Sequence, residues 1–154
     1  MADWTATGVI EAPLDKVCKA MLTVHEGRIG RDNAPLLAAF PGAGHLMTRA
    51  RLKGGPSHFT VHYADRSPAG GTVEVGPRSF AMQGGFKFRA EYEFSAHPEG
   101  TLLTYSAINV APPSHRDRAL VRLQFWLGAR LKIGLRGALR RTASILNCPT
   151  HPGT

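Results

Sequence analysis

The feature of this sequence that most constrains its fold is a change in hydrophobic periodicity along the chain. Between residues 45 and 111, apolar residues recur at alternate positions in short segments separated by clusters of glycine, proline, serine and aspartate. These segments are residues 46–52, 59–63, 72–75, 79–83, 86–95 and 102–110. Alternation with a period of two is typical of strands with one buried and one solvated face. We therefore expect a run of consecutive antiparallel hairpins.

After residue 111 the apolar residues follow the period of an α-helix. The run starts behind a capping-box pattern, Ser114 to Asp117, and stops at Asn147 and Pro149. About 30 helical residues would extend about 45 Å, long enough to cross an entire sheet. The apolar arc of this helix comprises Leu120, Val121, Leu127, Leu131, Leu135, Ala138, Leu139, Ile145 and Leu146. We expect this arc to pack against the sheet.

The segment that precedes the hairpins predicts one strand and two short helices. Residues 4–11 are rich in β-branched side chains and end at Ala12-Pro13, where a helix can begin. The next residues repeat at helical spacing and form one buried stripe: Leu14, Val17, Cys18, Met21 and Leu22. Asn33 precedes a second apolar stretch and is predicted to cap a short helix that ends before Pro41. The order of elements indicates an α+β protein.

Length and composition restrict the protein class. With 154 residues and 43% hydrophobic residues, the chain can form a single domain, residues 1–154, with a substantial core. No signal-peptide pattern and no apolar run of about 18 residues occurs, so we expect a cytoplasmic protein. Cys18 and Cys148 have no disulfide or zinc-ligand spacing, and we expect two reduced thiols.

This order of elements resembles the helix-grip fold of the START-like superfamily, which includes polyketide cyclases, Bet v 1-like allergens and SRPBCC-type ligand-binding domains. The local marks are Val9-Ile-Glu-Ala-Pro-Leu-Asp-Lys-Val and Gly100-Thr-Leu-Leu-Thr-Tyr. The resemblance covers nearly the whole chain, with a core at residues 4–147 and a short tail at residues 148–154. One departure is Cys18, where the family often has tryptophan or tyrosine after the valine of the first helix.

The resemblance implies a curved antiparallel sheet wrapped around the long C-terminal helix, with a mostly apolar cavity between them. Alternation places the following residues on the inward face: Phe59, Val61, Tyr63, Val73, Val75, Phe80, Met82, Phe88, Ala90 and Tyr92. On the last strand the resemblance turns Leu103, Tyr105, Ala107 and Asn109 inward, although the opposite register is nearly as apolar. The predicted ligand-binding residues are Tyr63, Phe80, Met82, Phe88, Tyr92, Tyr105, Asn109, Leu127 and Leu131.

Two functions fit such a cavity. The first is binding of a small or mid-sized hydrophobic ligand, such as a lipid, an isoprenoid or a polyketide-like molecule. The second is a polyketide cyclase or dehydratase that uses the same cavity. Tyr63, Tyr92, Tyr105 and Asn109 could hydrogen-bond a ligand, but each could equally be an ordinary core residue. The sequence identifies no catalytic residue, and acid–base chemistry would require His25, a tyrosine or a bound water.

No metal ion or cofactor is expected from the motifs. His58 and His62 share a strand face but lie about 13 Å apart in an extended chain, too far to ligate one ion. The motifs GxSxG, HExxH and GxGxxG and the phosphate-binding loop do not occur. The simplest interpretation is that the histidines occupy surface positions or loops.

The positive charge is concentrated on the predicted C-terminal helix. The chain has a formal net charge of +8, and most of this excess lies within residues 116–141. The basic stripe comprises Arg118, Arg122, Lys132, Arg136 and Arg140, and Phe125, Trp126 and Ile133 lie within or beside it. Such a surface suits an anionic membrane, an acidic protein or a second copy of the chain, but it could also be an ordinary solvated face. We expect no specific nucleic-acid partner, because no nucleic-acid-binding motif accompanies the charge.

Overall fold

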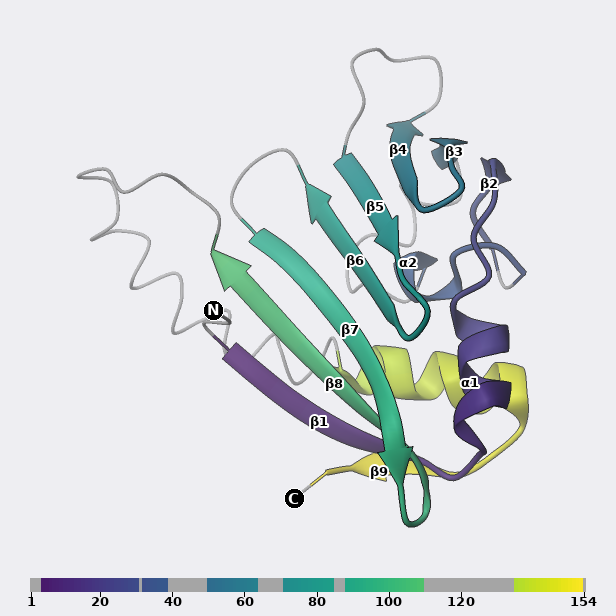
Figure 1. Cartoon of the computed structure of the whole chain (residues 1–154), viewed down its shortest axis with the longest axis vertical. Coiled ribbons are helices and arrows are strands. Elements are labelled where there is room, and N and C mark those ends of the chain that lie inside the picture. Colours follow the sequence, from purple (N-terminus) through teal and green to yellow (C-terminus); the bar gives the residue numbers. More distant parts are fainter. Residues whose placement is uncertain are drawn as a thin grey trace, which may run out of the picture.

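The computed structural model describes residues 4–30, 32–38, 50–63, 71–84, 88–109 and 135–153. The strands among these residues form one antiparallel sheet with the order β2-β3-β4-β5-β6-β7-β8-β1-β9 (Figure 1). The strands are β1 (Trp4–Ile10), β2 (Gly27–Arg28), β3 (Ala50–Gly54), β4 (His58–Tyr63), β5 (Gly71–Val75), β6 (Ser79–Gly84), β7 (Phe88–His97), β8 (Gly100–Asn109) and β9 (Thr150–Pro152). Strands β3 to β8 are the predicted hairpin run, and the expected α+β class is confirmed.

The described helices are α1 (Leu14–Met21), α2 (Pro35–Ala38) and residues 135–146. Helix α1 begins directly after Pro13, whose φ of −59° suits a helix start and whose carbonyl accepts a hydrogen bond from the Val17 N–H at 3.0 Å. Val17 and Met21 of the predicted stripe are fully buried. Within the described residues, no helix is long and apolar enough to cross a membrane.

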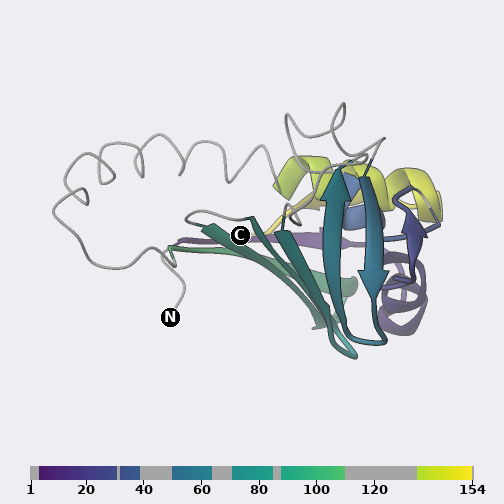
Figure 2. The same cartoon turned by 90° about the horizontal axis from the view of Figure 1, so that it is seen from above.

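The sheet is curved, and the helix at residues 135–146 lies across its inner side (Figure 2). Leu135, Ala138 and Leu139 belong to the same buried cluster as Phe94 and Leu103 of the sheet. Arg136 and Arg140 are exposed, so this part of the predicted helix has the expected faces. The rest of that predicted helix, which includes Leu120, Val121, Leu127, Leu131, Arg118, Arg122 and Lys132, lies outside the described residues.

Gly8 of β1 allows this helix to approach the sheet closely. A Cβ atom at Gly8 would lie 2.7 Å from Cδ1 of Leu139, closer than such atoms normally come. A larger residue at this position would force the Leu139 side chain to move. Gly8 pairs with Leu103 of β8, which belongs to the same buried cluster as Leu139.

Strand β7 shows the predicted alternation. Ala90, Tyr92 and Phe94 are buried, whereas Glu93 is exposed on the opposite face. On β8 the buried residues are Thr101, Leu103 and Tyr105, which establishes the inward register that the sequence left between two alternatives. The two strands pair with Tyr92 opposite Tyr105 and Phe94 opposite Leu103.

Two short strands extend the predicted sheet at its edges. Strand β2 pairs with β3, and β9 pairs with β1 so that Val9 lies opposite His151. The β9 pairing is continued by a hydrogen bond from the Gly153 N–H to the Thr7 carbonyl at 2.8 Å. Residues 148–154, expected to form a tail, thus contribute a strand to the sheet.

Asn33 does not cap α2, and that prediction is wrong. Helix α2 begins at Pro35, and the fully buried Asn33 amide bonds to the preceding loop. Its Oδ1 accepts a hydrogen bond from the His25 N–H at 2.9 Å, and its Nδ2 donates to the carbonyls of His25 at 3.0 Å and Arg28 at 2.8 Å. The side chain thus provides the hydrogen-bond partners of three backbone groups in this loop.

Candidate functional site

A stacked pair of tyrosines lies on the buried face of the sheet. Tyr92 on β7 and Tyr105 on β8 are direct cross-strand neighbours, with ring centroids 4.8 Å apart and ring planes inclined by 27°. Tyr92 is 1% exposed and Tyr105 is 5% exposed. Offset stacking at this separation is favourable for aromatic rings. The pair brings two phenolic hydroxyls into an otherwise apolar layer.

The surroundings of the pair are apolar. Phe80 on β6 lies opposite Tyr92, is fully buried, and has its ring centroid 6.1 Å from that of Tyr92. One row further along the strands lie Met82, Ala90 and Ala107, which pair across β6, β7 and β8. Met82 and Ala107 are only partly buried. The tyrosines thus lie between the densely packed core at Phe94 and Leu103 and a row with small or flexible side chains.

The structure brings three of the predicted ligand-binding residues together, namely Phe80, Tyr92 and Tyr105, with Met82 on the same face. Phe88 and Asn109 pair through their backbones, but their side chains and that of Tyr63 lie outside the described residues. Leu127 and Leu131 also lie outside them. Binding by any of these residues stays a prediction.

Burial strengthens the preference of the two phenols for the protonated state. Desolvation raises the pKa of Tyr92 well above its usual value, and the neighbouring Tyr105 raises it further. Desolvation also raises the pKa of Tyr105, an effect that the hydrogen-bond influence of Tyr92 partly opposes. Both side chains are therefore neutral near pH 7. A neutral phenol can donate a hydrogen bond to a ligand oxygen, but it is not available as a base.

The raised pKa values predict resistance to alkaline ionisation. Of the three tyrosines in the chain, Tyr92 and Tyr105 should remain protonated above pH of about 10 in the native protein and ionise normally in concentrated guanidinium chloride. Because the folded-state pKa is the higher one, stability is fully retained below the unfolded pKa and falls as pH rises above it. Phenolate absorbance measured against pH tests this. Normal titration of all three tyrosines in the native protein would contradict it, and Tyr92→Phe should remove one resistant group.

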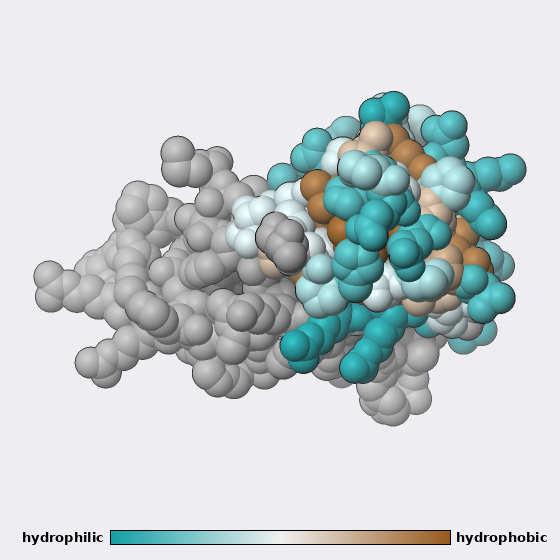
Figure 3. Space-filling model, turned by 90° about the horizontal axis from the view of Figure 1, so that it is seen from below, coloured by the Kyte–Doolittle hydropathy of each residue, from teal (hydrophilic) through white to brown (hydrophobic). Residues whose placement is uncertain are grey.

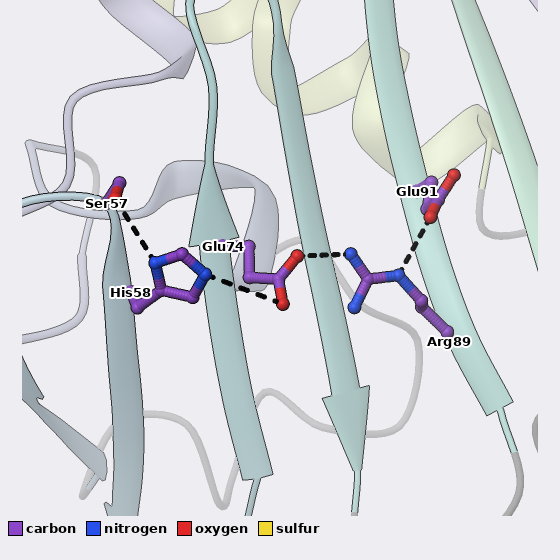
Figure 4. A network of polar contacts seen from close by, with 5 residues as sticks. All are labelled: Ser57, His58, Glu74, Arg89 and Glu91. Carbon is purple, nitrogen blue, oxygen red and sulfur yellow. Dashed lines mark hydrogen bonds and ion pairs between the residues drawn. The ribbon is translucent and has the colours of Figure 1, made fainter.

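The opposite, solvated face of the sheet carries a network of polar contacts (Figure 4). Arg89 of β7 binds Glu74 of β5 through one terminal nitrogen at 2.5 Å and Glu91 through Nε at 2.8 Å. The hydrogen bond from Arg89 lowers the pKa of Glu74, and the two carboxylates raise the pKa of the guanidinium. His58 of β4 lies near both Glu74 and Ser57. The arrangement links β4 to β5, and β5 to β7 across the intervening β6.

A partly open cleft of about 300 Å³ lies beside this network. It is lined by Ser57, His58, Glu74, Val75, Gly76, Ser79, Phe80, Ala81, Arg89, Glu91, Tyr92 and Glu93. Ser57, His58 and Glu74 have the composition of a hydrolase triad but not its geometry. His58 Nε2 lies 3.9 Å from the Glu74 carboxylate, beyond hydrogen-bond distance, and the His58 side chain is 76% exposed. We interpret the contacts of these residues as surface interactions between strands.

The other residues considered from the sequence occupy ordinary positions. His25 is exposed, and its Nδ1 lies 2.8 Å from the Glu26 carbonyl oxygen. Cys18 and Cys148 are free thiols, and partial burial raises the pKa of each, so both are protonated and weakly nucleophilic near pH 7. Arg136 and Arg140 are the residues of the basic stripe that the structure describes, and both are exposed. Binding of an anionic partner by this stripe stays a prediction.

The chain is similar to several solved structures. No protein-family model matches the chain, and no curated protein matches it either. The chain is similar to the Polyketide_cyc-like protein Cgl2372 from Corynebacterium glutamicum, with 18% identity over 92% of this chain and 88% of that one and a TM-score of 0.44.

Two further structures cover the chain to a similar extent. For the ZhuI aromatase/cyclase from Streptomyces sp. R1128, identity is 14% over 93% of each chain, with a TM-score of 0.46. For an uncharacterized protein from Rhizobium leguminosarum, identity is 18% over 92% of this chain and 96% of that one, with a TM-score of 0.37. These similarities concern the arrangement of the chain and not its activity.

Proposed function

We propose that the protein binds a small or mid-sized hydrophobic molecule between the inner face of the sheet and the C-terminal helix. The observation that carries this proposal is the stacked pair Tyr92 and Tyr105, which places two neutral hydroxyls on an apolar face. Ligand sites of this kind combine apolar walls with a few polar groups that orient the ligand. The partly buried Met82 and Ala107 mark the side from which a ligand would contact the pair.

The energetics favour a largely apolar ligand with a hydrogen-bond acceptor. Burial of apolar area contributes about 25 cal/mol per Å², so affinity would come mainly from contact with residues such as Phe80 and Met82. One hydrogen bond from a phenol would contribute about 1 kcal/mol and select the orientation. A ligand with a carbonyl or hydroxyl group beside an apolar body fits these requirements.

Native mass spectrometry of gently purified protein, followed by organic extraction, is the direct test of ligand binding. We expect a bound apolar molecule, or failing that, binding of at least one of three probes: oleic acid, farnesol and anthrone. An apo mass together with no binding of any probe would contradict the proposal. The extracted or bound compound then serves as the ligand for the variant described next.

Tyr105→Phe should weaken binding of an oxygen-bearing ligand such as anthrone by about fivefold, because it removes a hydroxyl and keeps the ring. Isothermal titration calorimetry gives the affinity. Phe59→Leu, a change on the same face but on β4, serves as the matched control and should leave the affinity within about twofold. Unchanged binding in Tyr105→Phe would remove this residue from the site.

A cyclase or dehydratase that uses the same residues is the second candidate. The neutral phenols favour it in one respect, because a protonated hydroxyl can polarise a ketone and assist its enolisation. For an enzyme, Tyr105→Phe should lower turnover of a poly-β-keto substrate by about 100-fold while the fold survives. A binding protein would show the loss of affinity alone.

A further inference from the structure

A mixed group of metal-ligating side chains gathers at the end of the sheet where β9 joins β1. Glu11 follows β1, Glu99 lies in the β7–β8 turn, and His151 lies on β9. One ligand atom from each residue lies within 4.8 Å of the others, and His151 Nε2 is 3.3 Å from Glu99 Oε2. All three side chains are exposed. The cluster lies near the Ile10–Thr101 pair, four residues along β8 from Tyr105, and shares no residue with the proposed ligand site.

The backbones that carry these side chains are held in place by close contacts. The Glu11 N–H donates to the Pro149 carbonyl at 3.0 Å, and Val9 pairs with His151 across β1 and β9. The Thr101 hydroxyl donates to the Ala12 carbonyl at 2.8 Å, which fastens the β7–β8 turn to the end of β1. The three side chains therefore start from fixed positions, and the arrangement does not depend on a flexible loop.

The imidazole can compensate the charge of at most one of the two carboxylates at this site. If His151 is neutral, two carboxylates face each other across a few ångströms, and if it is protonated, it can balance one of them. A divalent cation would balance both. Figure 3 views the molecule from the end that carries β9 and the β7–β8 turn, where hydrophilic residues cover much of the described surface beside smaller hydrophobic areas.

We propose that Glu11, Glu99 and His151 bind a divalent transition-metal ion, with Zn²⁺ the best match. An imidazole with two carboxylates suits borderline ions such as Zn²⁺, whereas Mg²⁺ and Ca²⁺ prefer oxygen ligands alone. Zinc–ligand bonds of about 2.0–2.2 Å need ligand atoms closer together than the present group, and the exposed side chains can close this gap. Water would complete the coordination. The ion would join β9 to the β7–β8 turn.

Calorimetric titration of the untagged protein with Zn²⁺ tests the site. We expect one ion per chain, and we expect His151→Ala and Glu99→Gln each to weaken its affinity by at least about tenfold. His58→Ala is the matched control, because it removes an exposed histidine that lies near one carboxylate, Glu74, and that belongs to no three-ligand group among the residues the structure describes. This variant should bind Zn²⁺ as the unaltered protein does, and excess Mg²⁺ should not compete.

A second measurement separates this site from binding by the thiols. Zn²⁺ should raise the Tm of the unaltered protein, of His58→Ala and of Cys148→Ser, but not that of His151→Ala. Absence of Zn²⁺ binding by the unaltered protein would overturn the proposal. So would full binding by His151→Ala, or binding that is lost in Cys148→Ser while His151→Ala retains it. Circular dichroism verifies that each variant is folded before titration.

Discussion

Replacing Gly100 with alanine should lower the free energy of unfolding by about 3 kcal/mol, because the new Cβ has no room and the backbone conformation is unfavourable. Gly100 has a φ of +138°, and a Cβ there would lie 2.6 Å from the Ile10 carbonyl oxygen and 2.8 Å from the Ala12 nitrogen. These neighbours are backbone atoms, which cannot rotate away as a side chain would. Denaturant unfolding measures the change.

Gly27 provides the matched control for this substitution. Its φ of +122° is also unfavourable for alanine, but nothing lies within 4 Å of a Cβ built there. Gly27→Ala should therefore cost about 1 kcal/mol, the conformational part alone. Equal losses in the two variants would show that the contact between the β7–β8 turn and the end of β1 does not determine the cost at Gly100.

The second large effect is expected for Asn33→Ala, which should lower the free energy of unfolding by about 3 kcal/mol. The buried amide satisfies one backbone N–H and two backbone carbonyls of the preceding loop, at His25 and Arg28. Each of these groups left unpaired away from water costs about 1 kcal/mol or more. Thermal and denaturant unfolding both report the loss.

Asn33→Asp distinguishes the hydrogen bonds from simple packing. Aspartate nearly keeps the size of the side chain and the acceptor, but when ionised it cannot donate to the two carbonyls. It should destabilise the protein at least as much as alanine does. Asp32→Ala, at the exposed neighbouring position, should change stability by less than about 0.5 kcal/mol. A mild effect of both Asn33 variants would show that water can satisfy the loop.

Gly100 also matters for the candidate ligand site, because it lies at the start of β8, the strand that carries Tyr105. Gly100 opens β8, and a displaced β7–β8 turn would shift the pairing along both strands. A shift of one residue would turn Tyr105 to the solvated face. Ligand affinity should therefore fall along with stability in Gly100→Ala but remain near its original value in the Gly27→Ala control.

The local elements and the faces they bury could be predicted from the sequence. Alternation predicted the buried side of β7, and helical spacing predicted the stripe of α1 and the faces of the helix at residues 135–146, because both are repeats within a few residues. It placed Tyr92 and Phe80 on the inner face for the same reason. Strand 102–110 had two nearly equal apolar faces, so periodicity alone could not choose between them.

Features that depend on residues far apart in the chain follow from tertiary packing and could not be predicted. Pairing with β7 selected the register that stacks Tyr105 on Tyr92. Strand β9 is too short to show alternation, and it exists because β1 offers an edge for hydrogen bonding. Glu11, Glu99 and His151 carry no shared motif, and Asn33 looked like a helix cap. The residues of each group come together only when the sheet forms. Contacts between distant segments follow from packing and leave no periodic pattern in the sequence.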